Sequence, residues 1–393
     1  MNSIVPVAIC DSKVSVSNSS PLLINLKNAP IPIIFPPFKT IPIPICIKIK
    51  RVCVTFNRKS SSSLHYLKPV LITLKGKVAI VTGASRGVGK GIALQLCQAG
   101  CTVFITGRRP ENSASSQVSF LSSLEETAKE CRDRGGECYP YYVDHSKMDE
   151  VEQFFKDVAE KTNNQLDILV NNAFSAVSQC GTGDNSRFFE RDPKLWDDVN
   201  NVGLRNHYYC SVYAARIMIQ NPIVPCLIVN ISSVGGGVYL FNTCYGVGKC
   251  AKDRMAHDMG HELQNTNITV ISLWPGAVKT ELITNLIKNK DESFGEAQNE
   301  MFMNGETTEY PGKAIVHLAK DSNMKKWNSA TIITADLGNY YGFRDIDGRK
   351  PANLRQVNAI LALQGYTKLA KWTPNWLKFT GWQISMWLNK FKY

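Results

Sequence analysis

Short runs rich in β-branched residues alternate with longer amphipathic segments from residue 76 onward, and this alternation restricts the fold more than any other feature. Seven runs are expected to be strands: residues 78–82, 102–106, 139–143, 168–171, 227–231, 269–273 and 331–334. Between them lie segments of helical length, such as residues 89–99 and 148–161. Buried strands separated by helices form a parallel sheet with helices on both faces. The pattern predicts an α/β fold with a single Rossmann-type doubly wound parallel sheet over residues 75–345.

Residues 1–70 differ in composition from the rest and are predicted to form a disordered or targeting extension. They contain nine of the 18 prolines, and five of these interrupt the most apolar stretch, residues 31–47. This density of proline excludes a helix, so neither a membrane span nor a signal peptide with a continuous apolar core is expected. The basic, acid-poor composition also suits a mitochondrial transit peptide, which is the weaker alternative. No run of the chain reaches the ~18 apolar residues of a spanning helix, which excludes a multi-span membrane protein.

The formal charge of +12 is concentrated at the two ends of the chain. Residues 1–77 hold 11 Lys and Arg against one acid, and residues 348–393 hold eight and no acid. The residues between them carry 26 basic and 32 acidic side chains, so this part is acidic and nucleic acid is not an expected partner. The 12 cysteines are scattered without a C-x-x-C pair. This predicts neither a metal site nor a disulfide framework and indicates a reduced, intracellular protein.

The first expected strand runs directly into a glycine-rich turn, Thr82 to Gly89, and a helix follows at once. Glycines let the backbone turn sharply and approach a pyrophosphate, which rests on the free N–H groups of the helix N-terminus. The spacing G-x-x-x-G-x-G differs from the commonest dinucleotide fingerprint, but its place between strand and helix favours a dinucleotide site. The expected cofactor-binding residues in the turn are Gly83, Ser85, Arg86, Gly87, Val88 and Gly89.

The end of the second strand indicates which nicotinamide cofactor is bound. An NAD site needs a carboxylate there for the ribose 2′-hydroxyl, and this chain has Arg108 and Arg109 with no acid. Arg86 in the glycine turn is expected to point toward the same region. Because arginine binds phosphate through two parallel hydrogen bonds, the pattern favours NADP(H) over NAD(H). The alternative is that Arg108 and Arg109 are solvated turn residues.

Further along the chain, Tyr245 and Lys249 are four positions apart, so in a helix they lie one turn apart on one face. There the ammonium stabilises a phenolate, which suits a tyrosine that acts as general acid or base near neutrality. The expected strand 227–231 is followed by Ser232 and Ser233, whose hydroxyls can bond a substrate oxygen as charge develops on it. A Y-x-x-x-K pattern alone is common on protein surfaces, so its meaning depends on the other motifs.

In their order and their residues, these motifs resemble the classical short-chain dehydrogenase/reductase family over residues 75–285. The glycine turn is similar to the family's T-G-x-x-x-G-x-G, and Ser233, Tyr245 and Lys249 are similar to its catalytic serine and Y-x-x-x-K. The resemblance also implies cofactor contacts for Asp144, an acid near the adenine, for Asn171, Asn172 and Ala173, and for Pro275, Gly276, Val278 and Thr280, whose threonine helps to hold the nicotinamide carboxamide.

The resemblance implies an NADP(H)-dependent oxidoreductase that reduces ketones or aldehydes, such as steroids, xenobiotic carbonyls or lipid-derived carbonyls. Ser233 then positions the carbonyl oxygen, the cofactor delivers hydride to the carbon, and Tyr245 donates the proton. Lys249 assists Tyr245 and holds the ribose hydroxyls of the cofactor. A small-molecule substrate and a homo-oligomer are implied as well. The alternative is a catalytically weak or inactive nucleotide-binding sensor or scaffold with the same fold.

Two departures from the family pattern motivate that alternative. Phe174 stands where the family has the glycine of N-N-A-G, and Gly203 stands where a catalytic asparagine is usual. Asn200 is close in sequence but offset along the helix, so it is not assumed to replace that asparagine. Ser232 is the alternative catalytic serine, because only 11 residues separate Ser233 from Tyr245 where the family usually has about 12.

Residues 346–393 form a basic, aromatic extension that holds four of the seven tryptophans within residues 371–392. Phe379, Trp382, Met386 and Trp387 fall at helical spacing beside several lysines. Tryptophan and lysine together predict a short amphipathic segment that lies on a membrane surface. The open alternative is a segment that packs on its own sheet or on a second subunit. The expected location is the endoplasmic reticulum membrane, by resemblance, or the cytoplasm, with the mitochondrion as a weaker alternative.

Overall fold

The computed structural model describes residues 73–109, 123–176, 186–288, 302–363, 366–374 and 376–379. The predicted extension over residues 1–70 and the part of the tail after residue 379 lie outside these ranges. Within the described ranges, no helix combines the length and the apolar character that a membrane crossing requires. The chain divides into two units, Met1–His65 and Tyr66–Tyr393, and all elements below belong to the second.

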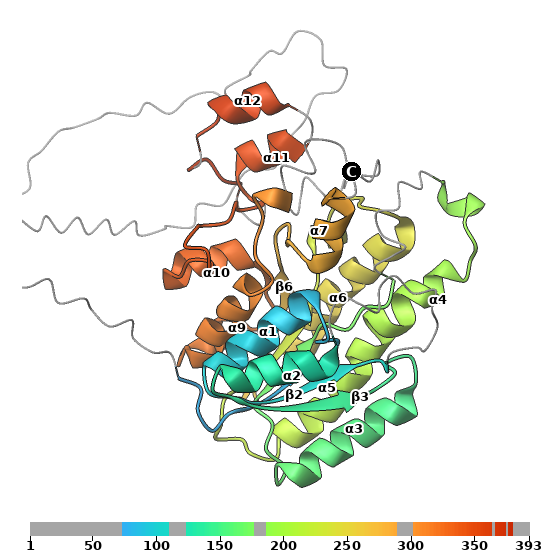
Figure 1. Ribbon diagram of the computed structural model, residues 1–393, viewed down its shortest axis with the longest axis vertical. Coiled ribbons are helices and arrows are strands. Elements are labelled where there is room, and N and C mark those ends of the chain that lie inside the picture. Colours follow the sequence, from blue (N-terminus) through green and yellow to red (C-terminus); the bar gives the residue numbers. More distant parts are fainter. Residues whose placement is uncertain are drawn as a thin grey trace, which may run out of the picture. The chain divides into compact units, whose positions relative to one another are not determined.

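One seven-stranded parallel sheet, with strand order β3-β2-β1-β4-β5-β6-β7, forms the centre of the second unit (Figure 1). The strands are β1 (Val78–Val81), β2 (Thr102–Gly107), β3 (Glu137–Tyr142), β4 (Ile168–Asn171), β5 (Cys226–Ile231), β6 (Ile268–Trp274) and β7 (Thr331–Ile333). The predicted single doubly wound parallel sheet is confirmed. The strand order reverses between β1 and β4, so ligands are expected beyond the carboxyl ends of these strands.

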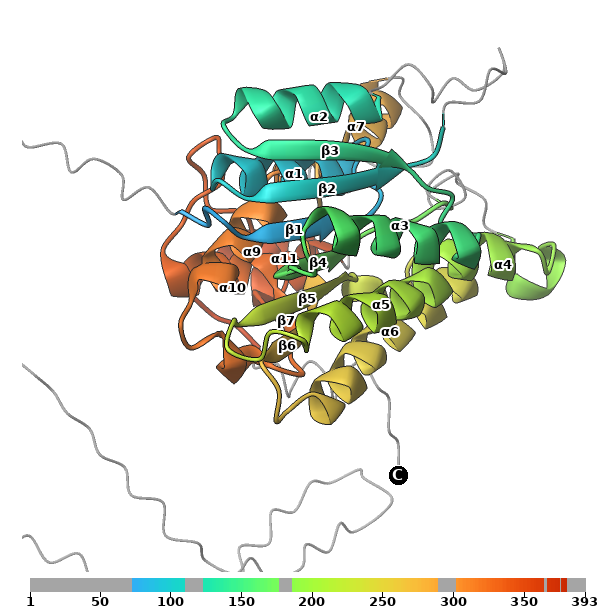
Figure 2. The same ribbon diagram turned by 90° about the horizontal axis from the view of Figure 1, so that it is seen from below.

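Helices cover both faces of this sheet (Figure 2). One face carries α1 (Gly87–Gln98), α2 (Leu124–Asp133) and α9 (Tyr310–Lys320), and the other carries α3 (Met148–Lys161), α5 (Asn206–Met218) and α6 (Thr243–Glu262). The side chains of each strand alternate between two buried clusters, because successive residues point to opposite faces. Thus Val81 packs in the first cluster and Ile80 in the second. Both clusters are apolar, which explains the nearly continuous apolar runs of the sequence.

Shorter elements connect these helices and strands. They are η2 (Phe188–Glu190), α4 (Leu195–Asn200), the π-helix η3 (Asn201–Arg205), η4 (Val234–Gly236), α7 (Glu281–Lys288), η5 (Met324–Trp327), α10 (Thr334–Tyr341), α11 (Val357–Leu363) and α12 (Thr367–Trp372). The last strand ends one residue earlier than predicted, because Thr334 already begins α10. Near the C-terminus, the backbone N–H groups of Val357 and Phe379 donate to the carbonyls of Leu377 and Arg355, each over 3.0 Å.

Candidate active site

The glycine turn between β1 and α1 needs glycine for steric reasons. Gly83 and Gly87 have φ of +66° and +58°, in the left-handed region that disfavours side chains. A Cβ on Gly83 would lie 2.7 Å from the Cα of Ala173, and one on Gly89 would lie 2.4 Å from the Gly83 carbonyl oxygen. The turn therefore brings bare backbone against the sheet edge at the start of α1, as a pyrophosphate site requires.

A carboxylate lies at the N-terminus of α1. The Gly87 N–H donates to Oε2 of Glu281, on α7, over 2.9 Å, while the side chain of the N-cap residue Arg86 does not cap the helix. The free N–H groups and the positive end of the helix dipole attract an anion to this position. An anionic group therefore fits the N-terminus of α1, and the residues present suit the phosphates of a dinucleotide.

The Asn171-Asn172-Ala173 motif supports the glycine turn from β4. The Asn172 side-chain amide donates to the carbonyls of Thr82 and Gly83, each over 2.9 Å, while the Thr82 hydroxyl accepts from the N–H groups of Asn172 and Ala173. Asn171 is fully buried and bonds within the interior, to Ser211 and Asn230 among others. The motif thus supports the shape of the turn, and its role in cofactor binding stays a prediction.

Positive side chains gather at the carboxyl ends of β1 and β2. Burial and the nearby charge of Arg108 lower the pKa of Arg86, while the Glu281 carboxylate opposes this shift. Arg108 also acts on Asp144 after β3, together with Lys147 and two hydrogen bonds from Ser146. These outweigh burial and lower the pKa of the Asp144 carboxyl. Arg109 lies over the ring of Tyr142, 5.1 Å from its centre. Arg86 and Arg108 are therefore neighbours, as the sequence predicts, whereas Arg109 stacks on an aromatic ring.

Ser233 and Tyr245 face each other across the end of β5, with 2.9 Å between their hydroxyl oxygens. Tyr245 is in the first turn of α6, and the side chain of the N-cap residue Asn242 accepts from the Tyr245 N–H over 2.9 Å. The other candidate serine, Ser232, is buried, and its hydroxyl donates to the backbone carbonyl of Lys249 over 3.1 Å. Of the two serines, the geometry brings Ser233 to the tyrosine.

Lys249 lies one helical turn beyond Tyr245, with its Nζ 5.4 Å from the centre of the tyrosine ring. The same Nζ is 5.3 Å from the ring centre of Phe174, and the rings of Phe174 and Tyr245 meet edge to face at 6.0 Å. A Cβ on Gly203 would lie 2.9 Å from the Phe174 ring. The two departures from the family pattern are therefore one structural feature, because the ring fills the space that a side chain at position 203 would need.

Asn200 does contact the catalytic helix. Its Nδ2 donates to the carbonyl of Cys244 over 3.4 Å, and a Cβ on Gly248 would lie 2.2 Å from its Oδ1. This Oδ1 is buried without a hydrogen-bond partner among the described residues. The position of Asn200 along the sequence did not indicate this packing. The π-helix η3 begins directly after Asn200.

The loop Pro275–Thr280 after β6 is held by an acid that the sequence patterns did not reveal. Glu306 is fully buried, exchanges backbone hydrogen bonds with Ala277 and Lys279, and accepts a side-chain bond from Thr334. Burial raises the pKa of Glu306 to about 8, against the opposing effect of the bonds from Thr334 and Gly276. Its carboxyl is therefore protonated at neutral pH. No local spacing predicts this contact, because it joins segments about 30 residues apart.

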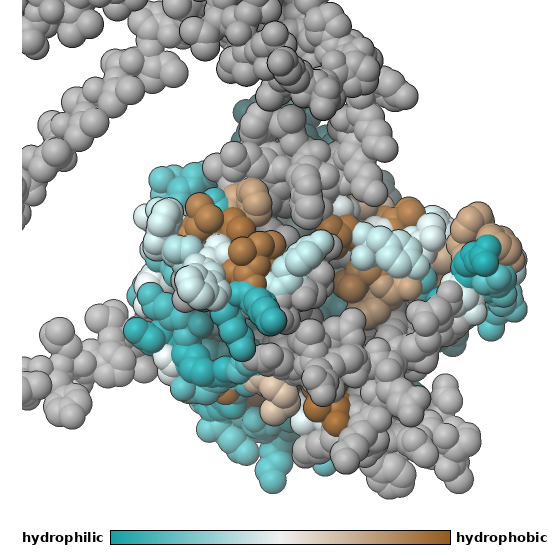
Figure 3. Space-filling model, turned by 90° about the horizontal axis from the view of Figure 1, so that it is seen from above, coloured by the Kyte–Doolittle hydropathy of each residue, from teal (hydrophilic) through white to brown (hydrophobic). Residues whose placement is uncertain are grey.

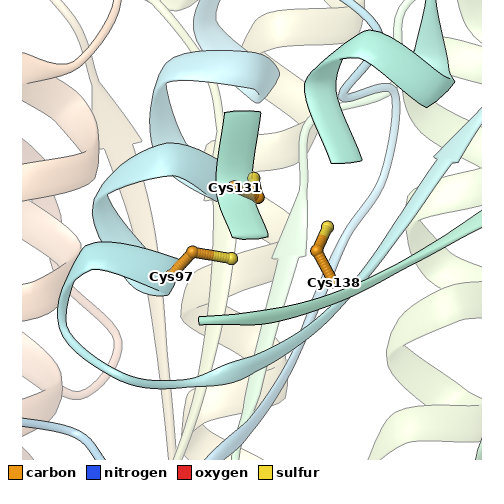
Figure 4. Close-up of side chains that lie close together, drawn as sticks. All are labelled: Cys97, Cys131 and Cys138. Atoms are coloured by element: carbon orange, nitrogen blue, oxygen red, sulfur yellow. The ribbon is translucent and has the colours of Figure 1, made fainter. Parts of the chain in front are cut away.

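Three cysteines that are far apart in the sequence lie close together near the amino end of β3 (Figure 4). The sulfurs of Cys97, Cys131 and Cys138, from α1, α2 and β3, all lie within 4.8 Å of one another and are buried. Hydrogen bonds from the other two thiols, together with burial, raise the pKa of Cys97. A structural zinc site takes four ligands, and no fourth His, Cys, Asp or Glu joins this group among the described residues. The cluster is best explained as three buried thiols that pack together in the core.

Fold and site define a class of protein: an oxidoreductase that binds a nicotinamide dinucleotide on a Rossmann-type sheet, with a serine, a tyrosine and a lysine beyond β5. Comparison with known proteins agrees, since the sequence profile described as short chain dehydrogenase matches residues 77–291. This chain belongs to the short-chain dehydrogenase family.

Individual relatives cover most of the described chain. Dehydrogenase/reductase SDR family member 1 of Homo sapiens is 41% identical over 322 residues, which are 81% of this chain and 99% of the relative. NADPH-dependent aldehyde reductase 2, chloroplastic, of Arabidopsis thaliana is 26% identical over 270 residues, 68% of this chain and 95% of the relative. The solved structure of a putative 2-deoxy-d-gluconate 3-dehydrogenase from Agrobacterium tumefaciens with bound NADP has a TM-score of 0.54 and 21% identity, covering 67% and 96% of the two chains, and shows the same fold.

Proposed function

We propose that this protein is an NADP(H)-dependent reductase of ketone and aldehyde carbonyls. The observation that carries the proposal is the 2.9 Å approach of the Ser233 and Tyr245 hydroxyl oxygens beside the Lys249 side chain. Two adjacent hydroxyls can bond the oxygen of one carbonyl group, which polarises the C=O bond and prepares a proton transfer. When bound, the nicotinamide supplies the hydride.

The residues of the chain have separate tasks in this reaction. Ser233 accepts a hydrogen bond from the Gly235 N–H over 3.0 Å, which orients its hydroxyl so that its own proton can point to the substrate oxygen. Tyr245 donates its hydroxyl proton to that oxygen as negative charge develops there. The Lys249 ammonium, 5.4 Å from the tyrosine ring centre, favours the phenolate that results.

An apolar carbonyl compound suits the surroundings of Tyr245. Its ring is flanked edge to face by Phe241 at 5.0 Å and by Phe174 at 6.0 Å. The molecular face seen in Figure 3 carries apolar patches among hydrophilic ones. The name of the Arabidopsis relative specifies an aldehyde substrate for that protein. The rings beside Tyr245 and the name of that relative support steroid, xenobiotic or lipid-derived carbonyls as the substrate class.

NADP(H) is the proposed cofactor in preference to NAD(H). Arg86 and Arg108 lie close enough to influence each other's charge, and Thr106, Gly107 and Arg108 end β2 without an acid. Two guanidinium groups suit a ribose 2′-phosphate, and the absence of a carboxylate leaves a ribose 2′-hydroxyl without its usual partner.

The test is consumption of NADPH by the purified full-length protein across a panel of ketones and aldehydes, with NADH and the Tyr245→Phe variant as controls. Turnover with NADPH that Tyr245→Phe abolishes supports the proposal. The second candidate, a nucleotide-binding sensor without turnover, is favoured by the Phe174 ring in front of Gly203. Tight NADPH binding with no turnover on any carbonyl would support the sensor.

We also propose that the tail tethers the enzyme to the surface of an intracellular membrane, with the endoplasmic reticulum as the location and a homo-oligomer as the assembly. Trp372 and Trp376 are 88% and 78% exposed, beside the exposed Lys371. Exposed indoles and nearby cations suit an anionic lipid surface. Deletion of residues 380–393 together with Trp372→Ala and Trp376→Ala should abolish flotation with anionic liposomes and leave NADPH binding intact. Unchanged flotation would contradict the tether.

A further inference from the structure

Lys252 lies on the same face of α6 as Tyr245 and Lys249, at helical spacings of seven and three. It is 2% exposed, and its Nζ donates to the Ile231 carbonyl at the end of β5 over 3.3 Å. The Nζ of Lys249 approaches the same carbonyl oxygen over 3.4 Å. The two amines thus converge on one acceptor oxygen, close enough for Lys249 to lower the pKa of Lys252, after the larger effect of burial. The Lys252 amine is therefore a second, more deeply buried amine beside that of Lys249.

The aromatic ring of Phe174 covers both amines. Its centre lies 5.3 Å from the Nζ of Lys249 and 5.9 Å from that of Lys252. In the part of the chain that the structure describes, the Lys252 amine donates to the Ile231 carbonyl, which the Lys249 amine also approaches. The Lys252 amine is thus shielded from solvent, and its protonation state depends on the neighbouring protein groups.

The charged and titratable groups around Lys252 come from its own helix and from α5. On α6, Asp253 is half-buried and accepts from the Ser272 hydroxyl over 2.5 Å and from the Trp274 indole over 2.9 Å. On α5, the Nε2 of His207 donates to a backbone carbonyl, which fixes this nitrogen as the protonated one. Burial lowers the pKa of His207, so its ring is neutral. Among the described residues, Asp253 is the carboxylate whose charge acts on Lys252.

Charge balance then favours a single ammonium for the two lysines. Two buried cations that share one carbonyl would repel each other at low dielectric, and one carboxylate, Asp253, balances one of them. Burial, followed by the charge of Lys249, lowers the pKa of Lys252. Lys252 is also the deeper of the two, at 2% exposed against 8% for Lys249. The neutral amine is therefore Lys252, and its lone pair is available to Lys249.

We propose that Lys252 is a positioning residue for Lys249: its neutral amine accepts a hydrogen bond from the Lys249 ammonium and holds that charge against Tyr245. This inference rests on the proposed function, in which Tyr245 is the proton donor. Without the acceptor, the Lys249 ammonium loses a partner in a closed site and stabilises the Tyr245 phenolate less well. The pH at which Tyr245 is half ionised then rises.

The experiment replaces the amine and follows Tyr245 directly. Lys252→Met keeps the length and the apolar stem of the side chain but offers no acceptor. The ionisation of Tyr245 is measured by its near-ultraviolet phenolate absorbance, as the difference between each protein and the same protein with Tyr245→Phe, with and without NADPH. We expect Lys252→Met to raise the midpoint by about one pH unit, the size of one hydrogen bond to a charged group. NADPH affinity is expected to stay unchanged.

Lys325→Met is the matched control, because Lys325 also donates to backbone carbonyls, those of Leu263, Thr266 and Ile268, at the far end of α6. It should lower the melting temperature without moving the Tyr245 midpoint. Lys252→Gln, which restores an acceptor, should recover part of the shift and serves if Lys252→Met does not fold. An unmoved midpoint in both Lys252 variants, or lost NADPH binding with an unmoved midpoint, would overturn the proposal. Because the titration needs no turnover, absence of carbonyl reduction would count against the proposed function alone.

Discussion

The ring of Phe174 occupies the space in front of Gly203, where an added Cβ would lie 2.9 Å from the ring carbon Cδ2. Position 203 lies in the π-helix between α4 and α5, and Phe174 follows β4, so the contact joins two segments on either side of the active site. The ring also lies over the Lys249 amine. The absence of a side chain at 203 and the bulk at 174 therefore depend on each other.

This dependence predicts strong coupling in a double-mutant cycle. Gly203→Ala alone forces the added methyl against the ring, and such overpacking costs about 1–3 kcal/mol. In a Phe174→Ala background the methyl has room, so the same change is expected to cost little. Urea unfolding of the four proteins should give a coupling free energy of at least ~1 kcal/mol. Additive effects of the two changes would show that the contact carries no energy.

The turnover prediction concerns the proton donor. Tyr245→Phe removes the hydroxyl that lies 2.9 Å from Ser233 Oγ and keeps the ring between Phe241 and Phe174. General acid catalysis contributes about 10²–10⁴-fold, so kcat for carbonyl reduction should fall by at least about 100-fold. NADPH affinity, measured by cofactor fluorescence, should be unchanged. Retention of most of the activity would exclude Tyr245 as the donor.

The sequence predicts the sheet well because its signal is local. Most strand residues are buried, so the strands are largely apolar, and all seven were located to within two residues. The spacing of Tyr245 and Lys249 is likewise a property of one helix, and Lys252 could have been found by the same periodicity. The periodicity places Lys252 on the same face of α6 as Tyr245 and Lys249, but it does not show that Lys252 is buried.

Such local patterns do not predict contacts between segments that are far apart in the sequence. Glu281 lies at the N-terminus of α1 although 194 positions separate it from Gly87. Glu306 joins the loop after β6 through tertiary packing, and its burial rather than its type makes it a neutral acid. The clustered thiols of Cys97, Cys131 and Cys138 come from three elements. In each case the chemistry depends on topology, which a single stretch of sequence does not contain.

Cofactor preference should depend on Arg108. Loss of a charge-assisted contact to phosphate costs about 1.5–3 kcal/mol, so Arg108→Ala should reduce the preference for NADPH over NADH by roughly ten-fold or more. Arg109→Ala is the matched control, because Arg109 stacks on Tyr142, and should change the preference less. Affinities for both cofactors are measured by fluorescence titration. Equal affinities of the wild type for NADPH and NADH would contradict the assignment.

Stability should fall with rising pH because of Glu306. Its pKa is raised from 4.5 to about 8 in the folded protein, so the unfolded chain loses this proton first as pH rises. The favourable contribution is complete below about pH 4.5 and is lost up to about pH 8, by about 1.4 kcal/mol per pH unit within that window. Glu306→Gln, which cannot ionise, should flatten this part of the pH dependence. Urea midpoints from pH 5 to 8 measure the effect, and equal slopes for both proteins would rule it out.

NADPH binding should strengthen when the Glu281 charge is removed. The Glu281 carboxylate accepts from the Gly87 N–H over 2.9 Å, at the helix end that suits the phosphates of a dinucleotide. The two negative groups therefore compete for the same N–H and for the charge of Arg86, on which Glu281 also acts. Glu281→Gln keeps the size of the side chain and removes the repulsion.

An interaction of a charge with a helix terminus is worth about 0.3–1 kcal/mol, so NADPH affinity should rise about two- to five-fold in Glu281→Gln. Salt screens charges, so the gain should shrink as ionic strength rises. Glu281→Asp, which retains the charge, is the control and should not show the gain. Fluorescence titration at low and high salt measures all three proteins. An unchanged or weaker affinity in Glu281→Gln would mean that the carboxylate does not compete with the cofactor.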